Sequence, residues 1–171
     1  MTAQPLERHW PRQWADDELR LLWEFLTFLR ITAVNKLAGL DARAAARAPL
    51  PTSPAMTLVG VVKHLTAVER EWLSIVGGGK ELPSLWTEDP EFDWRLTADD
   101  TPASVVVEYQ REWARSEAAL HGKAAGDAAA RTVNGRDRTV RWLLAHVVQE
   151  TARHVGHMDL LREMADGSRG E

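Results

Sequence analysis

The chain has 171 residues, a formal net charge of −4 and no cysteine. The absence of cysteine excludes disulfides, thiolate metal sites and cysteine nucleophiles, so any metal must be bound by His, Asp or Glu. The acidic charge balance comes without a basic block, which argues against nucleic acid as a partner. The length is typical of one domain, and we expect residues 1–171 to form a single unit with its own core.

No segment predicts export or membrane insertion. Residues 1–14 lack the apolar stretch and the small-residue cleavage site of a secretory signal. No window of the chain approaches 18 consecutive apolar residues, the length that would indicate a membrane-spanning helix. We therefore expect a cytoplasmic protein that is not bound to a membrane.

Apolar residues recur at spacings of three and four along four long segments, and almost nothing alternates with period two. This pattern predicts an all-α fold. Local signals mark the ends of the segments: Gly39 follows the first, Gly77 follows the second, Thr101 and Pro102 begin the third, and Gly167 follows the fourth. The helices are expected at about residues 17–38, 57–76, 102–121 and 139–165.

The connection between the second and third helices, residues 77–100, is far longer than the two to eight residues usual between neighbouring helices of a bundle. A connection of this length can cross from one end of a bundle to the other. We therefore expect a four-helix bundle in the order up-down-down-up. Trp86, Phe92 and Trp94 are expected to pin this crossover loop, and such loops often cover a site.

The fourth predicted helix carries three of the six histidines of the chain. At about 100° per residue, its polar stripe lies within an arc of about 80°. Leucines share this arc, so it faces a core, where polar groups must pair with one another or bind a metal. The stripe consists of His146, Glu150, His154 and His157, at spacings of four, four and three.

A metal ion inside a bundle needs ligands from at least two helices, and His64 of the second helix is the candidate from outside the stripe. Glu150 and His154, one turn apart, can bind one ion together. Two imidazoles and a carboxylate leave a coordination position open, as in catalytic zinc sites. His146 and His157 also lie at ligand spacing, so spacing alone leaves the ligand set open. A buried polar network without a metal is the alternative interpretation.

Two further side chains need a role. His157 is a candidate for a fourth ligand, a proton carrier or a residue that orients a ligand, and His146 for a structural histidine. Glu69 lies near the middle of the apolar arc of the second helix, where a carboxylate needs a partner. Arg153 is the partner that the sequence suggests. We expect this pair to hold two helices in register rather than to take part in chemistry.

Two stretches, HLTAVEREW at residues 64–72 and ETARHVGHMDLLREMADG at residues 150–167, closely resemble the domain-of-unknown-function branch of the DinB-like superfamily. This branch neighbours the mycothiol-dependent transferases and the N-terminal domain of maleylpyruvate isomerase. The resemblance extends over nearly the whole chain, including LWEFLTFLRITAVNKLAGL and RWLLAHVVQE. It implies an up-down-down-up bundle with a divalent metal bound by His64, Glu150 and His154.

The resemblance also implies an activity. A His-Glu-His ligand set is the version found in the mycothiol-dependent isomerase, so Glu150 favours the thiol-transferase neighbourhood. The implied chemistry is a metal-bound small thiol, deprotonated and presented to an electrophilic small molecule. Zinc is the favoured ion, and nickel, iron or manganese suit the same ligands. The resemblance further allows a homodimer.

Position 157 departs from the superfamily pattern, because many relatives carry glutamine where this chain has His157. We expect His157 to act in catalysis.

Two alternative functions of the protein stay open. A metal-dependent hydrolase would activate water at the same open position, with His157 as the proton carrier. A non-catalytic, stress-related protein would bind the metal without turnover.

Overall fold

The computed structural model describes residues 5–12, 17–87 and 89–170. Within these residues the regular elements are all helical and β pairing is limited to two isolated bridges, so the predicted all-α fold is confirmed. None of the described helices is both long and apolar enough to cross a membrane. The elements are α1 (Glu18–Asn35), α2 (Ala42–Ala45), α3 (Leu58–Glu69), the π-helix η1 (Arg70–Gly77), α4 (Pro102–Leu120) and α5 (Val140–Asp166).

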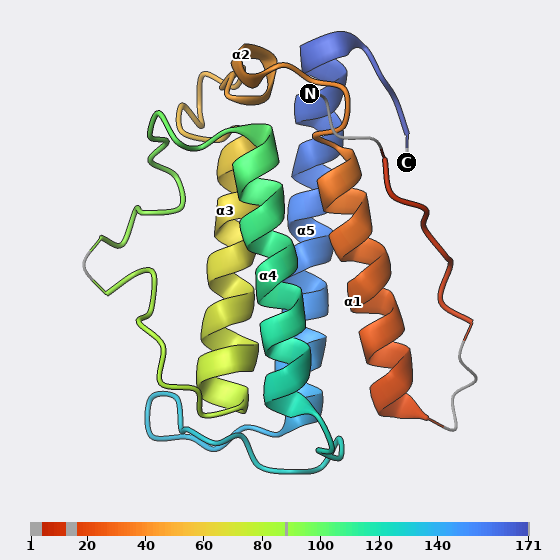
Figure 1. Ribbon diagram of the computed structural model, residues 1–171, viewed down its shortest axis with the longest axis vertical. Helices are drawn as coiled ribbons and strands as arrows, with labels where there is room; N and C mark the ends of the chain where they lie inside the picture. Colours follow the sequence, from red (N-terminus) through yellow and green to blue (C-terminus); the bar gives the residue numbers. More distant parts are fainter. Residues whose placement is uncertain (1–4, 13–16, 88, 171) are drawn as a thin grey trace.

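The long helices α1, α3, α4 and α5 lie side by side, with η1 continuing α3 (Figure 1). In this view α1 and α5 run upward, whereas α3 and α4 run downward. Helix α1 packs on α5, α5 packs on α3 and η1, and α3 and η1 pack on α4. The described parts of the crossover loop, residues 78–87 and 89–101, lie along the outer side of α3 and extend from one end of the helices to the other.

Side-chain caps fix where the long helices begin. The hydroxyls of Thr57, Thr101 and Thr139 each accept a hydrogen bond from a backbone N–H three residues further on. Such caps satisfy donors that a helix leaves unpaired in its first turn. Helix α5 ends at Gly167, whose φ of 80° is left-handed and therefore favours glycine.

Three local features differ from the prediction. Helix α1 ends at Asn35 rather than near residue 38, because the chain tightens there into hydrogen bonds between residues three apart. The alanine-rich stretch after Asp41 forms the short helix α2, whose N-terminus is capped by the Asp41 carboxylate. The second predicted helix continues to Gly77 but widens into the π-helix η1 after Glu69. In a π-helix each backbone hydrogen bond joins residues five apart rather than four.

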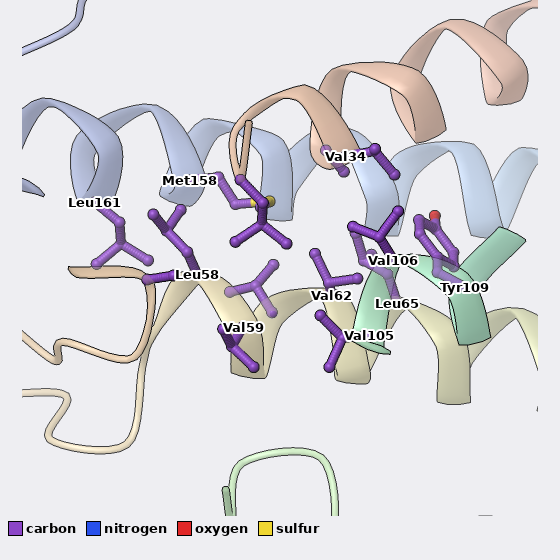
Figure 2. Close-up of a cluster of buried hydrophobic side chains, with 14 of the residues drawn as sticks. Val34, Leu58, Val59, Val62, Leu65, Val105, Val106, Tyr109, Met158 and Leu161 are labelled. Atoms are coloured by element: carbon purple, nitrogen blue, oxygen red, sulfur yellow. The ribbon is translucent and has the colours of Figure 1, made fainter. Parts of the chain in front are cut away.

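Buried apolar side chains from all four long helices fill the space between them. Figure 2 shows Leu58 and Val62 of α3 close to Met158 and Leu161 of α5, with Tyr109 of α4 in the same cluster. A second cluster joins η1 to the neighbouring ends of α1, α4 and α5. This packing fixes α3 against α5, and the candidate site lies between these two helices.

Candidate metal centre

Helices α3 and α5 bring His64, Glu150 and His154 together. Taking one ligand atom from each residue, the three atoms lie within 4.8 Å of one another. The rings of His64 and His154 have centroids 4.4 Å apart, and His154 Nε2 lies 3.5 Å from Glu150 Oε2. These distances allow one ion to contact all three, since metal ligand bonds are about 2.0–2.2 Å long. Within the described part of the chain, this is the one group of three with such a geometry.

The three side chains are largely enclosed, yet their hydrogen bonding is incomplete. Their exposed fractions are 15% for His64, 16% for Glu150 and 9% for His154. Both His64 Nε2 and His154 Nδ1 are buried and find no hydrogen-bond partner among the described residues. Buried polar atoms without partners are uncommon because their lost hydration costs free energy. A divalent cation would supply the missing partner of His64 Nε2, so the residues present fit such an ion.

The protonation state of His154 suits the role of a metal ligand. Burial lowers the pKa of His154, and the neighbouring His64 and His157 lower it further, to about 4. His154 is therefore neutral at pH 7, and the neutral imidazole is the form that binds metal. Arg153 Nη2 donates to Glu150 Oε1 at 3.1 Å, which holds this carboxylate while its other oxygen lies toward His154.

Asp93, a residue of the crossover loop that sequence analysis missed, contacts His64. Asp93 Oδ2 lies 2.7 Å from His64 Nδ1 and accepts a hydrogen bond of 2.9 Å from Trp86 Nε1. Burial raises the pKa of Asp93, but the hydrogen bonds from His64 and Trp86 outweigh it and bring the pKa below its usual value. The Trp94 ring stacks on the His64 ring, with 4.8 Å between the ring centroids. The tryptophans marked this loop as a cover, but no spacing distinguished Asp93 from its acidic neighbours.

The model of the mycothiol S-transferase family matches residues 21–167. The chain belongs to this family. The match covers the described helices from most of α1 to α5, and it includes all three residues of the triad and the crossover loop. None of the curated proteins compared with the chain matches it significantly. The resemblance inferred from residues 64–72 and 150–167 is thus confirmed as membership of a mycothiol-related transferase family.

In this member of the mycothiol S-transferase family, the other two histidines of the stripe lie in different surroundings. The His157 ring is 5.3 Å from that of His154 and nearly perpendicular to it, and its buried Nδ1 has no partner among the described residues. The His146 ring instead lies edge-on to the Trp72 ring and stacks on the Trp142 ring, with 4.6 Å and 5.1 Å between the ring centroids. His157 therefore adjoins the triad, whereas His146 packs within an aromatic column.

The predicted partner of Glu69 is wrong. Glu69 pairs with Arg30 of α1, whose Nε donates to Glu69 Oε2 at 3.0 Å and whose Nη2 donates to Oε1. Arg153 pairs with Glu150 instead. The reason is the direction of the α3 side chains: Glu69 points toward α1 and α4, where Ser116 Oγ also donates to it at 2.6 Å, rather than toward α5.

Proposed function

We propose that this protein is a metal-dependent thiol S-transferase that joins mycothiol, or a similar small thiol, to an electrophilic small molecule. The observation that carries the proposal is the largely enclosed triad, in which the buried His64 Nε2 has no partner among the described residues. Membership of the mycothiol S-transferase family supports a thiol as the co-substrate. The proposal includes a DinB-like bundle in up-down-down-up order and a cytoplasmic location, where small thiols are kept reduced.

His64, Glu150 and His154 would hold the ion, with zinc favoured and nickel, iron or manganese suited to the same ligands. When bound, the ion lowers the pKa of a coordinated thiol, so that thiolate is present at neutral pH. With three protein ligands, the ion would remain free to bind the sulfur atom of a small thiol. Arg153 keeps Glu150 in place for this task through its hydrogen bond to Oε1.

We assign to His157 the transfer of the proton that the thiol loses. Its ring lies against His154, and its buried Nδ1 has no partner among the described residues. An imidazole beside a metal ligand could accept the proton that the thiol loses and pass it to water. The stacked Trp94 covers one face of the His64 ring, which keeps water away from that side of the ligand.

The test is formation of a thioether. Protein loaded with Zn²⁺ is incubated with mycothiol and a chlorinated nitrobenzene, and the conjugate and released chloride are measured. We expect conjugate to form faster than in buffer, with the rate lost in His64→Ala and reduced in His157→Ala. A rate no greater than the uncatalysed rate would contradict the transferase proposal. Hydrolysis of an ester probe without any thiol would favour a hydrolase that uses the same residues.

A further inference from the structure

We propose that Asp93 is a positioning residue of the metal centre, which holds His64 in the tautomer that carries its proton on Nδ1 and leaves Nε2 available to the ion. The inference rests on the proposed function, because it gives a partner to one of the proposed ligands. Asp93 and His64 are 29 residues apart, so the contact links the crossover loop to α3. Carboxylates that orient a ligating histidine in this way commonly raise metal affinity.

Hydrogen-bond chemistry decides the tautomer. A neutral imidazole has one N–H and one bare nitrogen, and an ionised carboxylate can only accept. Since Asp93 Oδ2 lies 2.7 Å from His64 Nδ1, the proton is on Nδ1 and the lone pair is on Nε2. That nitrogen is the one that is buried without a partner among the described residues. The ring is therefore prepared for a cation on the side away from Asp93.

The position of Asp93 is itself fixed. Trp86 Nε1 donates to the same carboxylate oxygen at 2.9 Å, and the Asp93 side chain is 2% exposed. Trp94 stacks on the imidazole with only 21° between the ring planes. The loop thus sets the tilt and rotation of a ring whose backbone belongs to α3. The crossover loop is, in this account, a part of the metal centre.

The same loop offers a matched control. Asp100 accepts a hydrogen bond of 2.9 Å from the Nζ of Lys63, the residue before His64 in α3. It therefore anchors the loop to the same helix, but none of its hydrogen bonds or ion pairs involves a proposed ligand. Asp100→Asn weakens this anchor without removing a partner of His64. It separates a general loosening of the loop from a specific effect on the ligand.

The experiment measures Zn²⁺ affinity by competition with a chromogenic chelator. Asp93→Ala is expected to lower the affinity about 10- to 100-fold, Asp93→Asn to lower it less, and Asp100→Asn to leave it unchanged. A second readout is the ¹⁵N spectrum of His64 in the metal-free protein. The wild type should show the proton on Nδ1, and Asp93→Ala should move it toward Nε2. Helical circular dichroism of the metal-free variants checks folding.

Wild-type affinity in Asp93→Ala, or an unchanged His64 tautomer, would overturn the inference. So would an equal loss of affinity in Asp100→Asn, since loop anchoring would then explain the effect. His64→Ala separates the two proposals. If this variant binds Zn²⁺ like the wild type, the proposed metal centre is wrong. If His64→Ala loses Zn²⁺ but the Asp93 variants keep it, only the role of Asp93 is wrong. Should Asp93→Ala not fold, Asp93→Asn keeps the side-chain volume and carries the same comparison.

Discussion

Two polar clusters each include a residue of α3, and they differ in how completely their buried atoms are paired. The Arg30 guanidinium donates to Glu69, Ser116 and Glu117, so each of its nitrogens has a partner. Both carboxylate oxygens of Glu69 are also bonded. By contrast, His64 Nε2 and His154 Nδ1 are buried without partners among the described residues. We therefore expect the complete cluster to stabilise the fold, and we propose the incomplete cluster as the site of an ion.

The clusters differ in access as well. The side chains of Arg30 and Glu69 are 1% and 0% exposed, so nothing from solvent reaches the contact between them. The triad between α3 and α5 keeps a small exposed fraction at each residue. Solvent therefore touches the side chains of the triad, whereas the contact between Arg30 and Glu69 is closed to it. The contrast gives each cluster a different response to mutation.

The largest expected effect is the loss of the ion in His154→Phe. This variant removes a proposed ligand, so the zinc content should fall from about one ion per chain to near zero. Stability of the metal-free protein should fall little, because an aromatic ring is kept, the buried Nδ1 has no hydrogen bond to lose and Nε2 loses only its 3.5 Å contact with Glu150 Oε2. Elemental analysis and urea unfolding measure the two effects. His146→Phe, within the aromatic column, is the matched control and should keep its zinc.

Glu69→Ala should show the opposite pattern. Removing one partner of a buried ion pair costs about 3–5 kcal/mol, so the free energy of unfolding should fall by that amount while zinc affinity is unchanged. Urea unfolding and chelator competition test this. Glu117→Ala, whose side chain is 55% exposed, should cost less than about 1 kcal/mol. Zinc loss in Glu69→Ala at wild-type stability would show that the two clusters have been given the wrong roles.

The pH dependence of the metal-free protein should also separate the clusters. The pKa of His154 is lowered from 6.5 to about 4 in the native state, chiefly by burial. Between these values the unfolded chain binds a proton that the native state does not, so stability falls as the pH falls from about 6.5 to 4. The loss attributable to His154 is about 3 kcal/mol. In denaturant titrations between pH 6.5 and 4, the free energy of unfolding of His154→Phe should lack this loss. If the wild type and His154→Phe lost the same free energy over this pH range, the lowered pKa of His154 would be contradicted.

The smallest effect is expected at the edge of the site. Trp86→Phe removes the indole N–H that donates to Asp93 but keeps an aromatic ring in the loop. Zinc affinity should fall about 2- to 10-fold, the equivalent of one hydrogen bond of about 0.5–1.5 kcal/mol. Trp142→Phe, in the aromatic column beside His146, should have no effect on zinc. Equal losses in the two variants would remove the special role of the loop indole.

Sequence analysis predicted the features that depend on contacts between nearby residues and on helical periodicity. Helix α5 follows from its apolar spacing and from the stop signal at Gly167, and one turn of helix is enough to place Glu150 beside His154. His64 followed from the need for a ligand on a second helix and from the superfamily pattern. The all-α class needed no more than the absence of alternating segments.

Contacts between distant segments could not be predicted in the same way. Asp93 reaches His64 across 29 residues, and Arg30 reaches Glu69 across 39. No periodicity relates a loop side chain to a helix, because its position depends on the path of the whole loop. The error over Glu69 has the same origin. The arc of α3 showed that its carboxylate is buried, but not which neighbouring helix it faces.

The central claim is that the incomplete cluster between α3 and α5 is a metal centre. A crystal structure of the protein grown with Zn²⁺, with anomalous data at the zinc edge, tests it most directly. We predict one strong anomalous peak within bonding distance of His64 Nε2, Glu150 and His154, with Asp93 still hydrogen-bonded to His64 Nδ1. A triad without a peak at saturating zinc, or a peak bound by other residues, would contradict the claim.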